Sequence, residues 1–304
     1  MKTNVTITEK PDIAISGGYR QYPTVNSLSG GKTSSFMAMH VPADLNIFAC
    51  VCIDYLPAAP KDKALLKYAM QKLDGNFIAS AEHEKTLKVM MDLEQLLGNE
   101  IVWVRGKSFD EVVDGSGCLP TWARRFCTTD MKLLPIFEYV YPRYGFVNMN
   151  IGFRIDEPER IKKAQARNDG KAVMEYPISC NNFGKRRQNW SEFEYAIKRF
   201  PLSKTFHYEI RNYWKNEHSE IIFPFDSNCR GCHHKPKELI RANFDETPEI
   251  LEWFSLQEKK PKNGKNYTWQ DDKTTYDEIF KTEFPNLFSG VSDFTMCNTG
   301  GCTD

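Results

Sequence analysis

Short apolar runs alternate with helical patterns along the first half of the chain. The apolar runs predict strands at 46–53, 77–79, 101–104 and 146–153. Between these runs, apolar residues at helical spacing predict helices at 61–73, 86–97 and 128–141. Because strands that alternate with helices are joined by right-handed crossovers, we expect an α/β fold of Rossmann-like type, with a mostly parallel sheet flanked by helices.

The pattern changes near residue 175. Downstream of it, apolar residues at helical spacing, separated by loops, predict helices at 190–199, 206–216, 236–242 and 248–257. The strand at 146–153 is therefore the last major strand that we expect. This divides the chain into a nucleotide-binding α/β domain at 1–175 and a helical, cysteine-containing C-terminal region at 176–304.

Composition places the chain among ordinary globular proteins. Of its 304 residues, 41% are hydrophobic and 26% are charged, and 40 basic residues balance 40 acidic ones, which gives no nucleic-acid or membrane signal. The N-terminus lacks the apolar core of a signal peptide, and no run approaches the ~20 apolar residues that span a bilayer, so we expect a cytoplasmic protein. In that compartment, nine cysteines indicate metal ligands or catalytic thiols rather than disulfides.

The most informative segment is Val25–Ser35, where a short apolar run ends in hydroxyl residues, two adjacent glycines and a lysine. A helix-forming run follows directly, so the order predicts a strand, a tight loop and a helix N-terminus. Glycines let the backbone approach a ligand, and the N–H groups of a helix start favour an anion. We therefore predict a phosphate-binding loop. Its candidate nucleotide-binding residues are Ser27, Ser29, Gly30, Gly31, Lys32, Thr33 and Ser34.

Two kinds of phosphate loop compete for this segment. A Walker A loop has a glycine, four further residues and then Gly-Lys-Ser/Thr, and here its first glycine would fall at Asn26. The chain thus lacks the glycine that opens the wide Walker cradle. The residues from Ser29 to Ser34 fit better to the Ser-Gly-Gly-x-Asp/Thr-Ser pattern of the PP-loop of ATP pyrophosphatases.

Asp54 follows the strand predicted at 46–53. In parallel sheets the ligand binds at the carboxyl ends of the strands, where the loop at Ser29 also lies. We therefore expect Asp54 to face the same site, where a carboxylate can bind ribose, an amine or a metal-bridged phosphate. The alternative is a loop aspartate in solvent.

Cys229 and Cys232 form a CxxC motif, whose spacing can turn two sulfurs toward one ion. Thiolates are soft ligands, so zinc and iron–sulfur centres both suit the motif. A redox pair is the rival, but such a pair opens a helix in a small βαβ unit, whereas this motif lies in a loop late in the chain. The two histidines that follow the motif are either zinc ligands or solvated. Further candidate donors are Cys127, Cys297, Cys302, His233 and His234.

Four blocks of sequence carry a family resemblance when they are taken in order. They are Ser29–Ser34, the segment 125–128 with Lys132 and Pro135, the segment 152–157 with Arg160, and the CxxC at Cys229 and Cys232. Over residues 22–235, their order and rough spacing resemble the phosphoadenosine-phosphosulfate reductase family of PP-loop proteins, especially its divergent phage and mobile-element members.

The resemblance implies a site for ATP or a related adenine nucleotide, with Mg²⁺ bridging its phosphate oxygens. Arg154 and Arg160 would face the phosphate or sulfate, because guanidinium matches such oxyanions bidentately. The alternative for both arginines is ion pairing with neighbouring acidic residues. The implied catalytic residues are Lys32, Lys132 and Arg154.

In iron–sulfur members of the wider family, a Cys-Cys pair and a later CxxC hold a 4Fe-4S cluster. Cys127 matches the second member of that pair, and Phe126 stands at the first. The resemblance therefore implies a cluster, or alternatively Zn²⁺, on Cys127, Cys229 and Cys232. The fourth ligand would be Cys302 or Cys297, unless one iron stays open.

The function implied is that of an enzyme that cleaves or transfers at the phosphate or sulfate end of its nucleotide, in sulfur transfer to a nucleic acid or small molecule. The DNA-phosphorothioation sulfur-transfer enzymes are similar, and a partner protein or a homodimer would fit such a role. Two alternatives stay open. One is a sulfonucleotide reductase, although the Glu-Cys-Gly-Leu-His tail of the reductases is not found at 301–304. The other is a non-enzymatic nucleotide-binding adaptor of a phage or defence system.

Overall fold

A six-stranded sheet organises the protein, and the expected α/β fold is confirmed. The computed structural model describes residues 15–16, 19–20, 22–121, 124–181, 187–226 and 229–284. The sheet has the order β7-β4-β3-β8-β10-β9, and its neighbouring strands are parallel except for the antiparallel β9–β10 pair. Its strands are β3 (Thr24–Leu28), β4 (Leu45–Ala49), β7 (Ile101–Val104), β8 (Val147–Asn150), β9 (Lys171–Asn181) and β10 (Arg187–Arg199).

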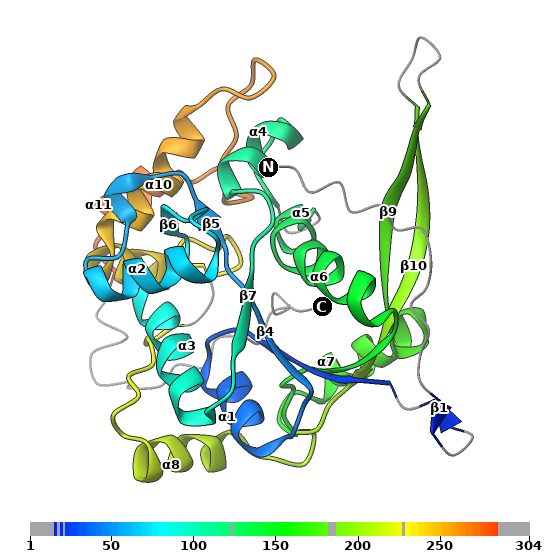
Figure 1. The fold of residues 1–304 in the computed structure, drawn as a ribbon. Helices are drawn as coiled ribbons and strands as arrows, with labels where there is room; N and C mark the ends of the chain where they lie inside the picture. The colour runs from blue at the N-terminus through cyan, green and yellow to red at the C-terminus, as the bar shows by residue number, and fades with distance from the viewer. Residues whose placement is uncertain are drawn as a thin grey trace.

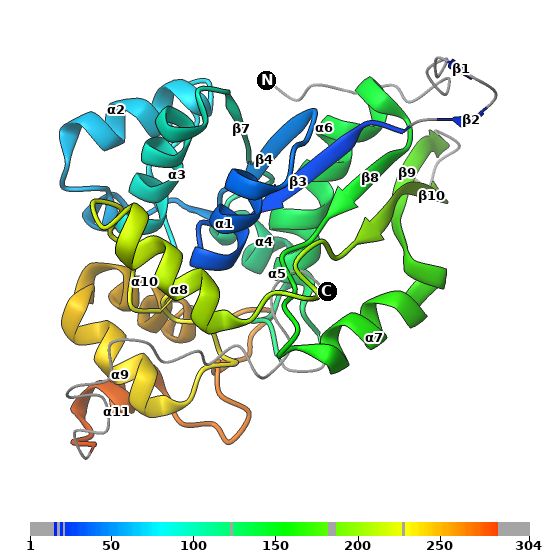
Figure 2. The same cartoon turned by 90° about the horizontal axis from the view of Figure 1, so that it is seen from below.

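Helices cover both faces of this sheet (Figures 1 and 2). Side chains alternate between the two faces along β4. Phe48 packs toward one face, and Ile47 and Ala49 pack toward the other. All five residues of β4 are buried, as expected for a parallel strand with helices on both sides. The first face carries α1 (Lys32–His40), α3 (Glu84–Leu97) and α8 (His207–Glu217), and the second carries α6 (Leu134–Tyr144).

The remaining elements surround this sheet. Side-chain caps fix several helix starts, such as Asp62, whose carboxylate accepts the N–H groups of residues 64 and 65 at the start of α2. The helices are α2 (Lys63–Lys72), α4 (Phe109–Ser116), α5 (Phe126–Thr128), α7 (Pro158–Ala166), α9 (Lys237–Glu246), α10 (Pro248–Lys259) and α11 (Tyr276–Lys281). Two small antiparallel sheets pair β1 (Ile15–Ser16) with β2 (Tyr19–Arg20), and β5 (Cys52–Ile53) with β6 (Ala79–Ser80).

The helix predicted at 190–199 is wrong, because this segment forms β10. It pairs parallel to β8 and antiparallel to β9, so the strand at 146–153 is not the last one (Figure 2). Along β10, the exposed Glu192 and Glu194 alternate with Phe193 and the buried Tyr195, which is the two-residue period of a strand. The domain boundary expected at residue 175 falls inside β9, and the sheet continues beyond it.

The C-terminal region is helical, as expected. Its helices α9, α10 and α11 pack with α4 around an aromatic cluster that includes Phe109, Trp253, Phe254, Trp269 and Tyr276. Phe109 of α4 therefore ties this region to the α/β part of the protein. No helix among the described residues has the length and apolar character needed to cross a membrane.

Glu258 gives this region a pH-dependent stability. Its buried carboxylate accepts hydrogen bonds from the backbone N–H groups of Trp269 (2.9 Å) and Tyr276 (2.8 Å). Burial raises the pKa of Glu258 to about 7 from 4.5, against the effect of these bonds. Between these values the folded state holds a proton that the unfolded state lacks, so the free energy of unfolding falls as pH rises through this window.

We expect deprotonation of Glu258 to lower the free energy of unfolding by up to roughly 3 kcal/mol as the pH rises through that window. Urea denaturation of the wild type and of Glu258→Gln at several pH values measures the effect as the difference between the two proteins. The free energy of unfolding of the variant, relative to that of the wild type, should increase as the pH rises. A difference that stays constant with pH would contradict the prediction.

Candidate functional site

The Ser-Gly-Gly loop joins β3 to α1 in only three residues, Ser29, Gly30 and Gly31. Ser34 braces the loop, because its Oγ accepts the N–H of Ser29 (3.1 Å) and donates to the carbonyl of Gly31 (3.2 Å). Gly31 is the N-cap of α1, where no side-chain cap forms. Since the first N–H groups of a helix have no partner within the helix, this loop presents donors that suit an anion.

Gly30 is required by the shape of this loop. Its φ of +74° lies in the left-handed region that side chains disfavour. A Cβ at this position would lie 2.3 Å from Cγ2 of Thr86 in α3, which is far inside van der Waals contact. The sequence therefore needs glycine here both for the backbone conformation and for the close approach of α3.

Asn26, which stands where a Walker loop has its first glycine, lies inside β3 and not in the loop. It is buried, its Nδ2 donates to Oδ1 of Asn46 (3.0 Å), and its Oδ1 accepts from Nδ2 of Asn150 (2.9 Å). These bonds link β4, β3 and β8 side by side. The strand thus continues through the position at which a Walker cradle would open.

Arg154 connects the start of α1, directly after the loop, to the segment after β8. Its Nη1 donates to Oγ1 of Thr33 (3.0 Å), its Nε pairs with Asp156 (3.0 Å), and Nη1 lies 3.3 Å from Oε2 of Glu157. Arg154 therefore forms the ion pairs expected under one alternative, and it also contacts Thr33 in the first turn of α1. Arg160 pairs with Glu157 instead and lies over the ring of residue 153 at 4.2 Å.

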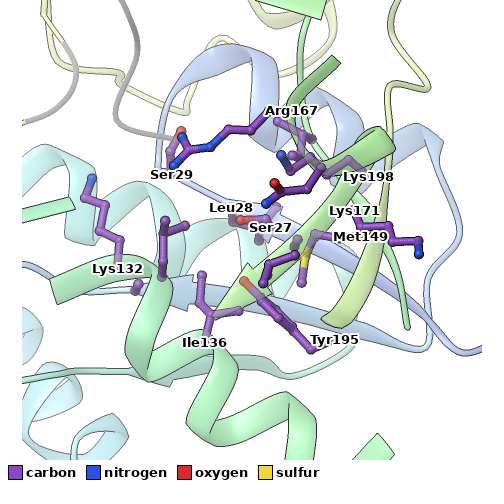
Figure 3. A pocket seen from close by; sticks show the side chains of 16 residues that line it. Ser27, Leu28, Ser29, Lys132, Ile136, Met149, Arg167, Lys171, Tyr195 and Lys198 are labelled. Carbon is purple, nitrogen blue, oxygen red and sulfur yellow. The ribbon is translucent and has the colours of Figure 1, made fainter. Parts of the chain in front are cut away.

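A cavity of about 900 Å³, including its open mouth, borders the loop between α6 and the β9–β10 pair. We call it the basic cavity, because all the charged residues among the described residues that line it are basic. Figure 3 shows Arg167 reaching toward Ser29 at its edge. The lining includes Ser27, Ser29, Lys132, Met149, Arg167, Asn168, Lys171, Tyr195 and Lys198.

A tight turn places two of these basic residues. Between Arg167 and Lys171, the backbone of Asn168, Asp169 and Gly170 has φ values of +53°, +51° and +76°. Two consecutive non-glycine residues in the left-handed region are costly, and such conformations gather at functional sites. The turn brings Arg167 and Lys171 to the same cavity.

Lys132 lies between the basic cavity and a second one. It belongs to a π-helical turn (Thr129–Leu133) that precedes α6, a local distortion frequent at functional sites. Its Nζ pairs with Oε1 of Glu82 at 3.1 Å, and the Glu82 side chain is fully buried. The other carboxylate oxygen of Glu82 has no hydrogen-bond partner among the described residues. Lys132 lines both cavities.

The second cavity, which we call the thiol cavity, gathers the predicted metal ligands. Cys127 comes from α5, whereas Cys229 and Cys232 come from the loop before α9, more than one hundred residues later. His233 lines it too, and Phe254 and Trp269 are among its apolar walls. Within the described part of the chain, no three His, Cys, Asp or Glu side chains are arranged closely enough to hold a metal ion as they stand.

His233, which lines the same cavity as these thiols, is buried, with 4% of its surface exposed. Burial lowers the pKa of His233 to about 3, and the neighbouring charges of His234 and Arg125 act in the same direction. The ring therefore stays neutral at physiological pH. Its Nε2 has no hydrogen-bond partner among the residues that the structure describes.

Other predicted residues lie elsewhere. Asp54 is exposed and does not line either cavity; its carboxylate accepts a hydrogen bond from Ser108, and its N–H donates to Asp110 (2.8 Å) at the start of α4. Arg154, Arg160 and residues 30–34 are also absent from the described lining of both cavities. Cys297 and Cys302 lie outside the described residues.

Comparisons of the chain with protein-family models, curated proteins and solved structures find no match. A parallel α/β fold hosts many unrelated chemistries, so the fold alone assigns no activity. Function is therefore argued from the two cavities and from the side chains that line them.

Proposed function

We propose that this protein is a PP-loop enzyme that binds ATP or a related adenine nucleotide and cleaves it at its phosphate or sulfate end. The observation that carries the proposal is that Ser29, the first residue of the Ser-Gly-Gly loop before α1, lines a cavity whose charged lining residues, among those described, are all basic. A nucleotide that reaches from this cavity to the loop would meet the N–H groups at the start of α1 as well as the guanidinium and ammonium groups of the cavity.

In the first step, an acceptor oxygen attacks the α-phosphorus of ATP. The bond from that phosphorus to the bridging oxygen breaks, and pyrophosphate leaves. The loop N–H groups and Lys32 stabilise the charge that develops on the leaving oxygens. Mg²⁺, when bound, neutralises the phosphate oxygens. Arg154 positions the loop through its bond to Thr33.

The thiol cavity supports sulfur transfer as the purpose of this cleavage. Lys132 lines both cavities, so a nucleotide in the basic cavity and the cysteines of the thiol cavity would both border this side chain. A cysteine-bound metal centre, zinc or iron–sulfur, fits the donors of this cavity by chemistry, since thiolate and neutral imidazole both bind such ions. The acceptor would be a nucleic acid or a small molecule.

Arg167→Ala and Lys198→Ala should each weaken ATP binding about 10-fold or more, because each removes a cation from the basic cavity. Isothermal titration calorimetry measures the affinity. The matched control is Lys162→Ala, which removes a lysine of α7 whose side chain is 71% exposed and should leave the affinity unchanged. Equal affinities in all four proteins would contradict this assignment of the cavity.

Turnover is tested by pyrophosphate release from ATP in the presence of Mg²⁺. Lys32→Ala should abolish a release that the wild type sustains, whereas Lys162→Ala should retain it. If the wild type bound nucleotide but released no pyrophosphate, the proposed enzyme function would be wrong and a nucleotide-binding adaptor would take its place. If the wild type released sulfite from a sulfonucleotide, the function would be that of a reductase.

A further inference from the structure

The thiol cavity holds one nitrogen donor as well as its sulfur donors. Cys127, Cys229 and Cys232 line it together with His233, and the side chains come from two segments far apart in the sequence. Its other walls are mainly apolar, including Val51, Met131, Phe109, Phe254 and Trp269. A polar nitrogen buried in such surroundings is costly unless it has a partner.

The hydrogen bonding of His233 defines which of its nitrogens can bind a ligand. The ring donates a hydrogen bond to the backbone of Thr121, and the nitrogen without a partner among the described residues is Nε2, so Nδ1 is the donor. In a neutral imidazole with the proton on Nδ1, Nε2 carries a lone pair. Metal-bound histidines are held in this way, with the second nitrogen donating to a backbone carbonyl or a carboxylate.

We propose that His233, through Nε2, completes with Cys127, Cys229 and Cys232 a four-coordinate site for a thiophilic metal ion, with zinc as the expected occupant. Three cysteines and one histidine are an established donor set for tetrahedral zinc. The thiols must turn toward the ring for the site to close, and rotation about a Cα–Cβ bond moves a sulfur without moving the backbone. On binding, the three thiols release their protons to solvent and the imidazole stays neutral.

The inference changes the ligand set expected from the sequence. With His233 as the fourth donor, neither Cys297 nor Cys302 is needed at the site. It also distinguishes two adjacent histidines, because His233 lines the cavity whereas His234 does not belong to its lining. The proposal deepens the cysteine centre of the proposed function, and it is tested with metal alone so that its failure leaves nucleotide binding untouched.

The test is an anaerobic titration of the reduced, chelator-stripped full-length protein with Co²⁺, followed by displacement with Zn²⁺. We expect one cobalt per chain, with the visible bands of tetrahedral cobalt and a thiolate-to-cobalt charge-transfer band. His233→Ala should weaken binding by more than about 100-fold, since even partners of the ligands contribute roughly 10–100-fold. His234→Ala and the double variant Cys297→Ser/Cys302→Ser should bind as the wild type does.

His233→Cys keeps four donors and guards against a folding defect in the alanine variant. It should retain tetrahedral cobalt, with a stronger charge-transfer band from the added sulfur. The proposal is overturned by a wild type that binds no cobalt or by a His233→Ala variant with wild-type affinity. Loss of binding in Cys297→Ser/Cys302→Ser would also overturn it, because the C-terminal cysteines would then supply the fourth ligand.

Discussion

Lys132→Met should lower the free energy of unfolding by about 3–5 kcal/mol, because removing one partner of a buried ion pair leaves the other charge without compensation. The Lys132 side chain is 11% exposed, and that of Glu82, at 3.1 Å, is fully buried. One oxygen of Glu82 already lacks a hydrogen-bond partner among the described residues, so the lysine is an important source of compensation for this carboxylate. Urea denaturation measures the loss.

Two further variants show whether the loss comes from the buried charge. Lys132→Met/Glu82→Gln should recover much of the stability, because a neutral amide replaces the stranded carboxylate, and the two substitutions should therefore be far from additive. Lys162→Met breaks a pair with Glu159 in which both side chains are 71% exposed, and it should cost at most about 1 kcal/mol. If Lys132→Met were as mild as this control, the pair would not have the importance that we assign to it.

The parts of the site that sequence could predict are those that local chemistry specifies. The Ser-Gly-Gly loop was predictable because a strand, two glycines and a helix start follow one another in the chain. The approach of Thr86 to Gly30 was not, since it depends on how α3 packs. Similarly, the spacing of Cys229 and Cys232 indicates a shared ligand, whereas the position of Cys127 beside them follows from tertiary structure.

The sequence did not predict the basic cavity, because the apolar pattern of β10 also fits a helix. Trp190, Phe193 and Ile197 recur at a spacing of three and four residues, which fits a helical face as well as it fits β10. Pairing with β8 favours the strand, and that contact joins residues almost fifty positions apart. As a strand, the segment brings Lys198 to the cavity beside Arg167.

Asp54 shows a related limit of sequence reasoning. The apolar run at 46–53 predicts one strand, but the structure divides it into β4 and β5. β5 leaves the six-stranded sheet and pairs with β6. The end of the run therefore lies beside Ser108 at the start of α4 and away from the loop. The hydrophobic pattern gives burial correctly, but it does not say which sheet a buried strand joins.

Gly30→Ala should destabilise the protein by roughly 2–4 kcal/mol and weaken ATP binding, because it adds overpacking to backbone strain. The strain comes from a φ of +74°, and the overpacking from a Cβ placed 2.3 Å from Cγ2 of Thr86. Relief of that clash must move either the loop or the start of α3. Since we propose that the N–H groups of the loop bind phosphate, its movement should reduce affinity as well as stability. Urea denaturation and calorimetry measure the two effects.

Two controls separate strain from clash. Gly98 also has a positive φ, +62°, but a Cβ there meets nothing within 4 Å, so Gly98→Ala should show only the strain, about 1–2 kcal/mol, with unchanged ATP affinity. Thr86→Ser removes the Cγ2 atom, so Gly30→Ala/Thr86→Ser should recover to about the level of Gly98→Ala and regain part of its affinity. If Gly30→Ala were no worse than Gly98→Ala, or if Thr86→Ser gave no rescue, then contact with α3 would not hold the loop in its binding shape.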